Sequence, residues 1–258
     1  EGFEASWEVT RDSVSKVLRH LSEFGILSPE ILPSQNALIP LFVLQSRFNE
    51  DFKFNKALWW FLLATGDGRY SGSAITTLDQ DVRAIFDCSS FDDAIEVLHS
   101  PLRISDSFSK EDFLRDLRDG YLRLVLYLVT FRREAKDWIH QDIRIGYDRS
   151  DNQLNAGFKP EWHHFFPKTF LRRHNVDESR INSLANIVLL NERANRAFTS
   201  RQPIDYIEAY EVTNERLTEQ LIPLNRELWQ VENYDKFLDT RATALAEAAQ
   251  NFMAELAR

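Results

Sequence analysis

Apolar side chains in this chain recur mostly at spacings of three and four residues, the period of an α-helix with one buried face. Two clear stripes are Val14, Val17, Leu18, Leu21 and Phe24 near the start, and Leu238, Leu245, Ala249, Phe252 and Leu256 near the end. No series of alternating strands is evident. The sequence therefore predicts a mainly α-helical protein, a helical bundle.

Several further helices are expected from their start signals. Residues 40–48 and 56–64 are predicted to be helical, one helix is expected from Thr77 or Asp79, and Pro203 is placed to open another. Ser109 with Asp112 matches a capping box, which predicts one long helix from there through residue 131. The aromatic run Trp59-Trp60-Phe61 is interpreted as core.

The chain has one cysteine, Cys88, so it has no internal disulfide and suits a reducing, cytoplasmic compartment. The longest apolar run, Leu124 to Val129, is too short to span a bilayer, and there is no signal peptide at the start. We therefore expect no contact with a membrane. The chain does not begin with Met, and we expect it to be part of a longer protein.

The net charge of −9 does not suit a protein that binds nucleic acid over its whole surface. The charge is unevenly distributed, however. In residues 159–203 Lys and Arg outnumber Asp and Glu by 4, whereas none of the segments 1–101, 102–158 and 204–258 has a net positive charge. A local basic patch can bind phosphates on an acidic protein, so this segment is the candidate binding region.

The same segment holds an unusual set of polar residues. His163 and His164 are adjacent and are followed by Phe165-Phe166-Pro167-Lys168. Asn186 follows in the run 181–190, and Asn195 comes nine residues later. Asparagine is a poor residue inside a helix, so its recurrence at 182, 186, 191 and 195 suggests a site. We expect two short strands within 158–166 to carry the histidines and a helix over 186–198 to close over them.

This pattern resembles the HNH nucleases, whose core is a small ββα module around one metal ion. The resemblance assigns His164 as the general base, His163 and Asn195 as metal ligands, and Asn186 as the catalytic residue that fixes the loop or the orientation of His164. The surrounding sequence, about a fifth of the chain, is similar to the C-terminal part of modification-dependent restriction enzymes such as GmrSD and SspE. Residues 68–79 and 234–241 also look like that larger family.

The chain departs from many HNH proteins in one respect. Those proteins hold a structural zinc with two pairs of cysteines, and Asn191 and Ala194 occupy the positions of the second pair here. A cysteine zinc site is therefore excluded. The expected cofactor is a single divalent cation, Mg²⁺ or Mn²⁺, because one imidazole and one neutral amide suit an ion that keeps several waters.

The chemistry implied is hydrolysis of a phosphodiester bond. A neutral imidazole can take a proton from water, and a divalent cation can neutralise charge on the leaving oxygen. Adjacent residues of a strand point to opposite faces, so a bend at the strand end is needed to bring both histidines to one site. The cations expected to contact nucleic-acid phosphates are Lys168, Arg172, Arg193 and Arg196.

The expected organisation is a helical domain over residues 1–140, an HNH module over 141–210 and C-terminal helices over 211–258 that pack on the rest. The resemblance implies a DNA endonuclease of a restriction or phage-defence system. Its partners would be phage or modified DNA and a nucleotide-hydrolysing domain that precedes this chain. Two alternatives remain open: a non-catalytic helical module that binds DNA or docks through a degenerate nuclease fold, and a toxin that cleaves RNA.

Overall fold

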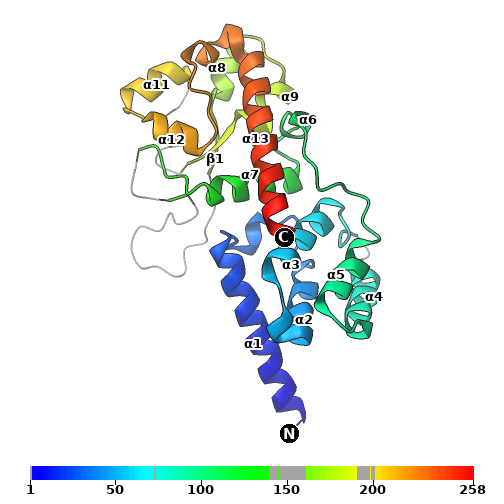
Figure 1. Ribbon diagram of the computed structural model, residues 1–258. Helices are drawn as coiled ribbons and strands as arrows, with labels where there is room; N and C mark the ends of the chain where they lie inside the picture. Colours follow the sequence, from blue (N-terminus) through cyan, green and yellow to red (C-terminus); the bar gives the residue numbers. More distant parts are fainter. Residues whose placement is uncertain (1, 73, 140–143, 146–160, 191–197, 199–200) are drawn as a thin grey trace. The chain divides into compact units, whose positions relative to one another are not determined.

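The computed structural model describes residues 2–72, 74–139, 144–145, 161–190, 198 and 201–258, and they are mainly helical (Figure 1). The one sheet among these residues has two strands. The expectation of a mainly α-helical protein is thereby confirmed. No helix in the described part is long and apolar enough to cross a membrane.

The chain divides into two compact units, which are described separately. Unit 1 comprises Glu1–Ser107 and Asn251–Arg258, and unit 2 comprises Phe108–Gln250. The domain limits expected from the sequence, residues 1–140, 141–210 and 211–258, stay a prediction. Much of the segment before the histidine pair, including residues 146–160, lies outside the described residues.

Unit 1 is helical. Its elements are α1 (Gly2–Glu23), η1 (Pro29–Ile31), α2 (Leu38–Phe48), η2 (Asn49–Asp51), α3 (Phe54–Gly66), α4 (Ala74–Asp87) and α5 (Phe91–His99). Helix α3 forms the centre of the core because its apolar residues occupy most of its circumference. Trp60 and Phe61 are fully buried, whereas Trp59 is only half-buried and packs against His99. The interpretation of this aromatic run as core holds for two of its three members.

Unit 2 contains the two strands and the segment singled out in the sequence. Its elements are α6 (Lys110–Phe113), α7 (Gly120–Arg132), β1 (Glu161–His164), α8 (Lys168–Arg173), α9 (Glu178–Ile181), η3 (Leu184–Asn186), β2 (Ile187–Leu190), α11 (Pro203–Ala209), α12 (Asn214–Glu219), η4 (Arg226–Trp229), η5 (Val231–Asn233) and α13 (Tyr234–Leu256). The last turns of α13 belong to unit 1. Pro203 opens α11 as expected.

The single long helix expected from Ser109 to residue 131 is wrong, because the chain leaves the helix after Phe113 and starts a new one at Gly120. The capping box of Ser109 and Asp112 is present, and it opens only the short α6. Asp119 caps α7 by accepting a hydrogen bond from the Leu122 N–H at 3.1 Å. The periodicity of apolar residues did not reveal this second cap.

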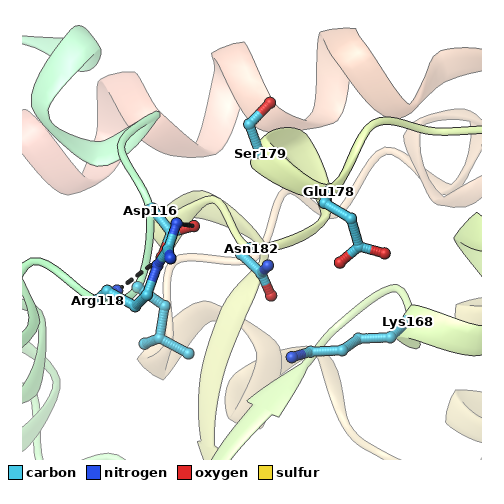
Figure 2. A pocket seen from close by; sticks show the side chains of 7 residues that line it. Asp116, Arg118, Lys168, Glu178, Ser179 and Asn182 are labelled. Atoms are coloured by element: carbon cyan, nitrogen blue, oxygen red, sulfur yellow. Dashed lines mark hydrogen bonds and ion pairs between the residues drawn. The ribbon is translucent and has the colours of Figure 1, made fainter.

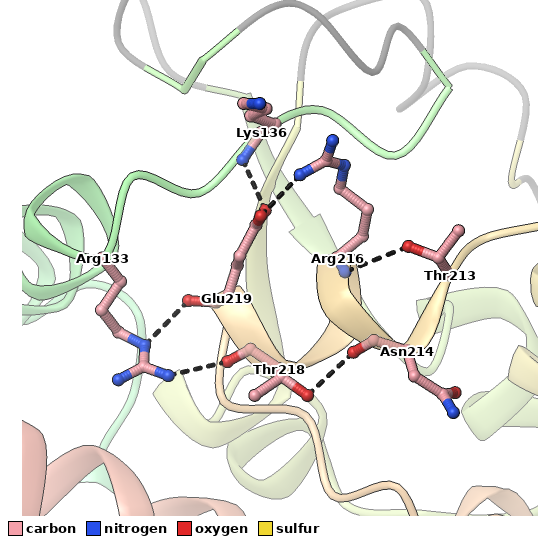
Figure 3. A network of polar contacts seen from close by, with 7 residues as sticks. All are labelled: Arg133, Lys136, Thr213, Asn214, Arg216, Thr218 and Glu219. Carbon is pink, nitrogen blue, oxygen red and sulfur yellow. Dashed lines mark hydrogen bonds and ion pairs between the residues drawn. The ribbon is translucent and has the colours of Figure 1, made fainter.

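A polar network fixes the end of α12 (Figure 3). The Arg133 guanidinium donates to the carbonyls of Thr218 and Glu219, at 3.0 Å each, and so satisfies groups that the helix end leaves unpaired. The Glu219 carboxylate accepts from the Lys136 N–H at 2.9 Å and from Arg216 at 2.5 Å. These contacts place Gln220, the residue that follows α12, beside strand β2.

Unit 1 contains a buried ion pair on α4. The Arg69 guanidinium binds both oxygens of Asp81, at 2.8 and 2.6 Å, and the Tyr70 hydroxyl donates to the same carboxylate at 2.6 Å. Asp81 is 4 % exposed. Arg69 thus anchors the turn 66–70 to α4, a role that the sequence alone left undecided.

Removing the Asp81 carboxylate should destabilise unit 1 strongly. Asp81→Ala leaves the Arg69 charge partly buried without its partner, so we expect a loss of about 3 kcal/mol in the free energy of unfolding. Asp79→Ala is the matched control, because Asp79 pairs with Arg83 on the exposed face of the same helix. Asp79→Ala should reduce the free energy of unfolding by less than about 1 kcal/mol. Chemical denaturation measures both, and equal losses would contradict the assignment.

Candidate functional site

Strands β1 and β2 pair in antiparallel fashion and carry both histidines. The register sets His163 opposite Val188 and His164 opposite Ile187. Residues 187–190 form a short, wholly buried run that begins with two β-branched residues, which suits a strand enclosed on both faces. The helix expected over 186–198 is therefore wrong at its beginning, and its residues 191–197 lie outside the described part. β1 lies within the expected range 158–166, but its partner strand comes more than twenty residues later.

The two histidines lie on opposite faces of this strand pair. The His163 ring packs against the aromatic rings of Phe198 and Tyr206, with centroids 5.5 and 6.3 Å away. The His164 ring faces Asn182, with Nε2 and the amide Oδ1 separated by 3.3 Å. Both residues stay within the regular pairing of β1, so the described residues show no bend that turns both rings to one side.

His164 is buried and uncharged at neutral pH. Burial, together with the nearby positive charge of Lys168, lowers the pKa of its imidazole to about 3. The ring therefore keeps a lone pair throughout the physiological pH range, which a proton acceptor requires. A negative charge brought next to Lys168 would offset that charge and raise the basicity of His164.

Asn186 is fully buried and clamps the chain just after the histidine pair. Its side-chain Oδ1 accepts from the Phe166 N–H at 2.9 Å. Its Nδ2 donates to the carbonyls of Phe166, at 3.1 Å, and Ile181, at 3.0 Å. All these bonds reach backbone atoms, so Asn186 fixes the loop that follows His164. The structure shows no bond from Asn186 to the His164 ring itself, so its expected catalytic role remains a prediction.

Three more buried polar side chains hold this region, and the sequence analysis did not identify them as functional. The Tyr206 hydroxyl donates to the Phe165 carbonyl at 2.6 Å. Gln220 binds both the N–H and the carbonyl of Leu189, at 2.7 Å each, and so completes the free edge of β2. Arg241 donates to the carbonyls of Ala185, at 2.8 Å, and Gln220, at 3.1 Å.

The position of Arg241 in the sequence indicates that its side chain is buried. It lies between Leu238 and Leu245 at spacings of three and four, so it occupies the apolar stripe of α13. An arginine in such a stripe is rare unless its charge is paired or bound to carbonyls. Burial lowers the pKa of Arg241 to about 9, which leaves the guanidinium charged at neutral pH.

A pocket of about 420 Å³ is lined in part by Asn182, the residue that the His164 ring faces (Figure 2). It is lined by Asp116, Leu117, Arg118, Lys168, Glu178, Ser179 and Asn182. Figure 2 shows the Lys168 side chain reaching toward Asn182 from one side, while Asp116 and Arg118 lie on the other. His164 does not line the pocket itself, and Asn182, which contacts the His164 ring and lines the pocket, connects the two.

The cations predicted to contact phosphates differ in their surroundings. Lys168 lines the pocket and has no ion pair among the described residues. Arg172 is held by both oxygens of Glu178, at 2.5 and 3.1 Å. Arg193 and Arg196 lie outside the described residues, as does the predicted metal ligand Asn195.

The described residues contain no group of three or more His, Cys, Asp or Glu side chains that could hold a metal ion. The ligand set expected from the sequence, His163 with Asn195, is smaller than such a group, and only its first member is described. An imidazole and an amide oxygen suit a divalent cation that keeps most of its own water. The assignment of His163 and Asn195 as metal ligands therefore stays a prediction.

Asn186 can be tested as the loop clamp. Asn186→Ala removes three hydrogen bonds and leaves buried backbone groups of Phe166 and Ile181 without partners, so we expect a loss of about 3 kcal/mol in the free energy of unfolding. Asn182→Ala is the control, because Asn182 is only half-buried and its side chain makes one long bond. Its loss should be under about 1 kcal/mol. Denaturant midpoints compare the two, and similar losses would refute the clamp.

The low pKa of His164 predicts how stability depends on pH. The imidazole binds protons more readily in the unfolded chain, where its pKa is about 6.5, than in the folded chain. The neutral ring therefore makes its full contribution to the free energy of unfolding above that pH, and the contribution declines as the pH falls. From pH 7 to pH 5 the parent chain should lose about 2 kcal/mol more than His164→Gln does. Urea unfolding at both pH values measures this difference. Parallel losses in the two proteins would show that His164 is not buried as a neutral ring.

Comparisons with known proteins give one relative. A protein of Methanocaldococcus jannaschii described as "Uncharacterized protein MJ0686" is 21 % identical over 206 residues, which cover 78 % of this chain and 33 % of the relative. The chain thus spans about a third of the length of that protein. No family model and no solved structure matches the chain. A function must therefore be argued from the site itself.

Proposed function

We propose that this chain is a metal-dependent DNA endonuclease of the HNH type, acting in the cytoplasm in a modification-dependent restriction or phage-defence system. The observation that carries the proposal is the environment of His164. A neutral, buried imidazole lies at the end of β1, near a pocket lined by Lys168, whose ammonium has no ion pair among the described residues. This combination provides a proton acceptor next to a binding place for a phosphate.

The arrangement around the imidazole supports the proposal. The β1–β2 pair carries His164 at its end, and Asn186 fixes the loop that leads from it to Lys168. Both side chains therefore have a defined position before a substrate arrives. Preorganisation of this kind is what hydrolysis needs, because attack requires a water held in line with the bond that breaks.

The steps assigned to this chain are binding and proton transfer. Lys168 binds a phosphate oxygen in the pocket and thereby brings negative charge close to the His164 ring, which raises its basicity. His164 then accepts a proton from the attacking water. A divalent cation, Mg²⁺ or Mn²⁺ held by His163 and Asn195, would supply the charge that the leaving oxygen requires. The choice of modified DNA would belong to the nucleotide-hydrolysing domain that the resemblance implies as a partner, or to its junction with this chain.

A second candidate is a non-catalytic module that binds DNA through a degenerate nuclease fold. The position of His163 favours it, because that ring packs edge-on against the stacked rings of Phe198 and Tyr206, on the face of the strand pair away from His164. Such a module would keep the cationic pocket without performing hydrolysis. It predicts DNA binding that no divalent cation converts into cleavage.

The test is cleavage of supercoiled plasmid in Mg²⁺, in Mn²⁺ and in EDTA. We expect nicking or cutting that depends on the metal and falls roughly 10²- to 10⁴-fold in rate in His164→Ala, the usual effect of losing a general base. His174→Ala is the matched control, since His174 is an exposed histidine at the end of α8, and it should cleave like the parent.

Either of two results would contradict the assignment. Cleavage by His164→Ala at the parental rate would remove the proposed base. DNA binding by the parent chain and by the full-length protein without cleavage in either metal would favour the non-catalytic module.

A further inference from the structure

One wall of the pocket comes from a segment far from the histidine motif in sequence. Residues 115–118, between α6 and α7, lie alongside residues 182–184 through two backbone hydrogen bonds. The Leu117 N–H donates to the Asn182 carbonyl at 2.8 Å, and the Leu184 N–H donates to the Arg115 carbonyl at 2.9 Å. The break of the expected long helix at Phe113 thus places Asp116 and Arg118 beside the site.

The charges of the pocket are arranged asymmetrically. Both carboxylates on its rim are bound by arginines through two bonds each: Asp116 by Arg118, at 2.9 and 3.1 Å, and Glu178 by Arg172. Lys168 remains without an ion pair among the described residues. A group entering the pocket therefore meets one uncompensated positive charge and two carboxylates whose charge is already neutralised.

Arg118 is suited to exchange its partner Asp116 for an entering anion. The Arg118 side chain is 89 % exposed, and an ion pair so accessible to water contributes little to stability. A phosphate can accept two parallel hydrogen bonds from the guanidinium, as the carboxylate does, so the exchange loses no hydrogen bond of Arg118. Asp116 would then hold Arg118 near the pocket and release it when a phosphate arrives.

We propose that Arg118 joins Lys168 as a ligand of the phosphodiester group that binds in this pocket. The inference rests on the proposed function for the identity of the strand. It adds a binding residue, Arg118, that lies outside the HNH motif, and it gives Asp116 the role of a competitor for Arg118.

Binding of a fluorescein-labelled DNA duplex, measured by anisotropy in EDTA over a series of salt concentrations, tests this subsite without cleavage. Arg118→Ala should raise Kd by roughly five- to tenfold and reduce the slope of log K against log salt by about one, the signature of one lost phosphate contact. Lys168→Ala should do the same. Asp116→Asn should lower Kd by about two- to threefold, because it frees Arg118 while keeping the side-chain oxygen that accepts from the Arg118 N–H.

The matched control is Arg115→Ala. Arg115 belongs to the same segment and is also exposed and paired, with Asp119, but it does not line the pocket. It should bind DNA like the parent. All four substitutions affect exposed or half-buried side chains, and thermal unfolding checks that each variant is folded.

The test is decisive because Kd is expected to fall in Asp116→Asn and to rise in Arg118→Ala. A general weakening of the fold would not tighten binding in Asp116→Asn, so a lower Kd in that variant with a higher Kd in Arg118→Ala supports the subsite. Equal binding by the Arg118→Ala and Arg115→Ala variants overturns it, and so does the absence of DNA binding by the parent chain. Cleavage that persists in His164→Ala would refute only the catalytic assignment, because the binding measurement in EDTA is independent of it.

Discussion

The site depends most on the buried amide of Asn186. Its three hydrogen bonds join the loop after β1 to the end of α9, two segments that would otherwise expose unpaired backbone groups inside the core. Because Phe166 is held in this way, Lys168 begins α8 at a defined position and His164 faces Asn182. Asn186 thus acts on the site through the backbone. Only an amide side chain could make these three bonds, since the position requires one hydrogen-bond acceptor and a group that donates two hydrogen bonds.

The helices could be predicted from the sequence where the apolar pattern is clear by itself, since α2 and α3 have no side-chain cap. This held for α2, α3 and α13, whose stripes are long or strongly apolar. It failed where a short element is determined by distant partners. The break between α6 and α7 depends on Asn182 and Leu184, far along the chain, and β2 is a strand because β1 and Gln220 satisfy its backbone on both sides. An apolar run as short as 187–190 has no period that distinguishes a strand from a buried helix.

The candidate site was predictable only in part, and there is a physical reason why some of its residues show in the sequence and others do not. His164, Asn186 and Lys168 follow one another within a short stretch, so their spacing shows in the sequence. Arg118 and Gln220 reach the site through tertiary contacts, and neither has an unusual local context. Arg241 is the intermediate case, because its place in an apolar stripe marks it as buried without indicating what it binds.

The acidic composition of the chain is compatible with a phosphate site because net charge and local charge are set separately. At the pocket, Arg118 and Arg172 neutralise the carboxylates of Asp116 and Glu178, and Lys168 remains as the excess charge. Burial keeps the neighbouring His164 neutral, so the ring adds no positive charge of its own and retains its lone pair. Replacing Lys168 with a neutral residue would therefore have two linked consequences, because the same ammonium is the proposed phosphate ligand and lowers the pKa of His164. In the proposed mechanism, an anion that arrives in the pocket would change the basicity of the nearby imidazole and so couple binding to proton transfer.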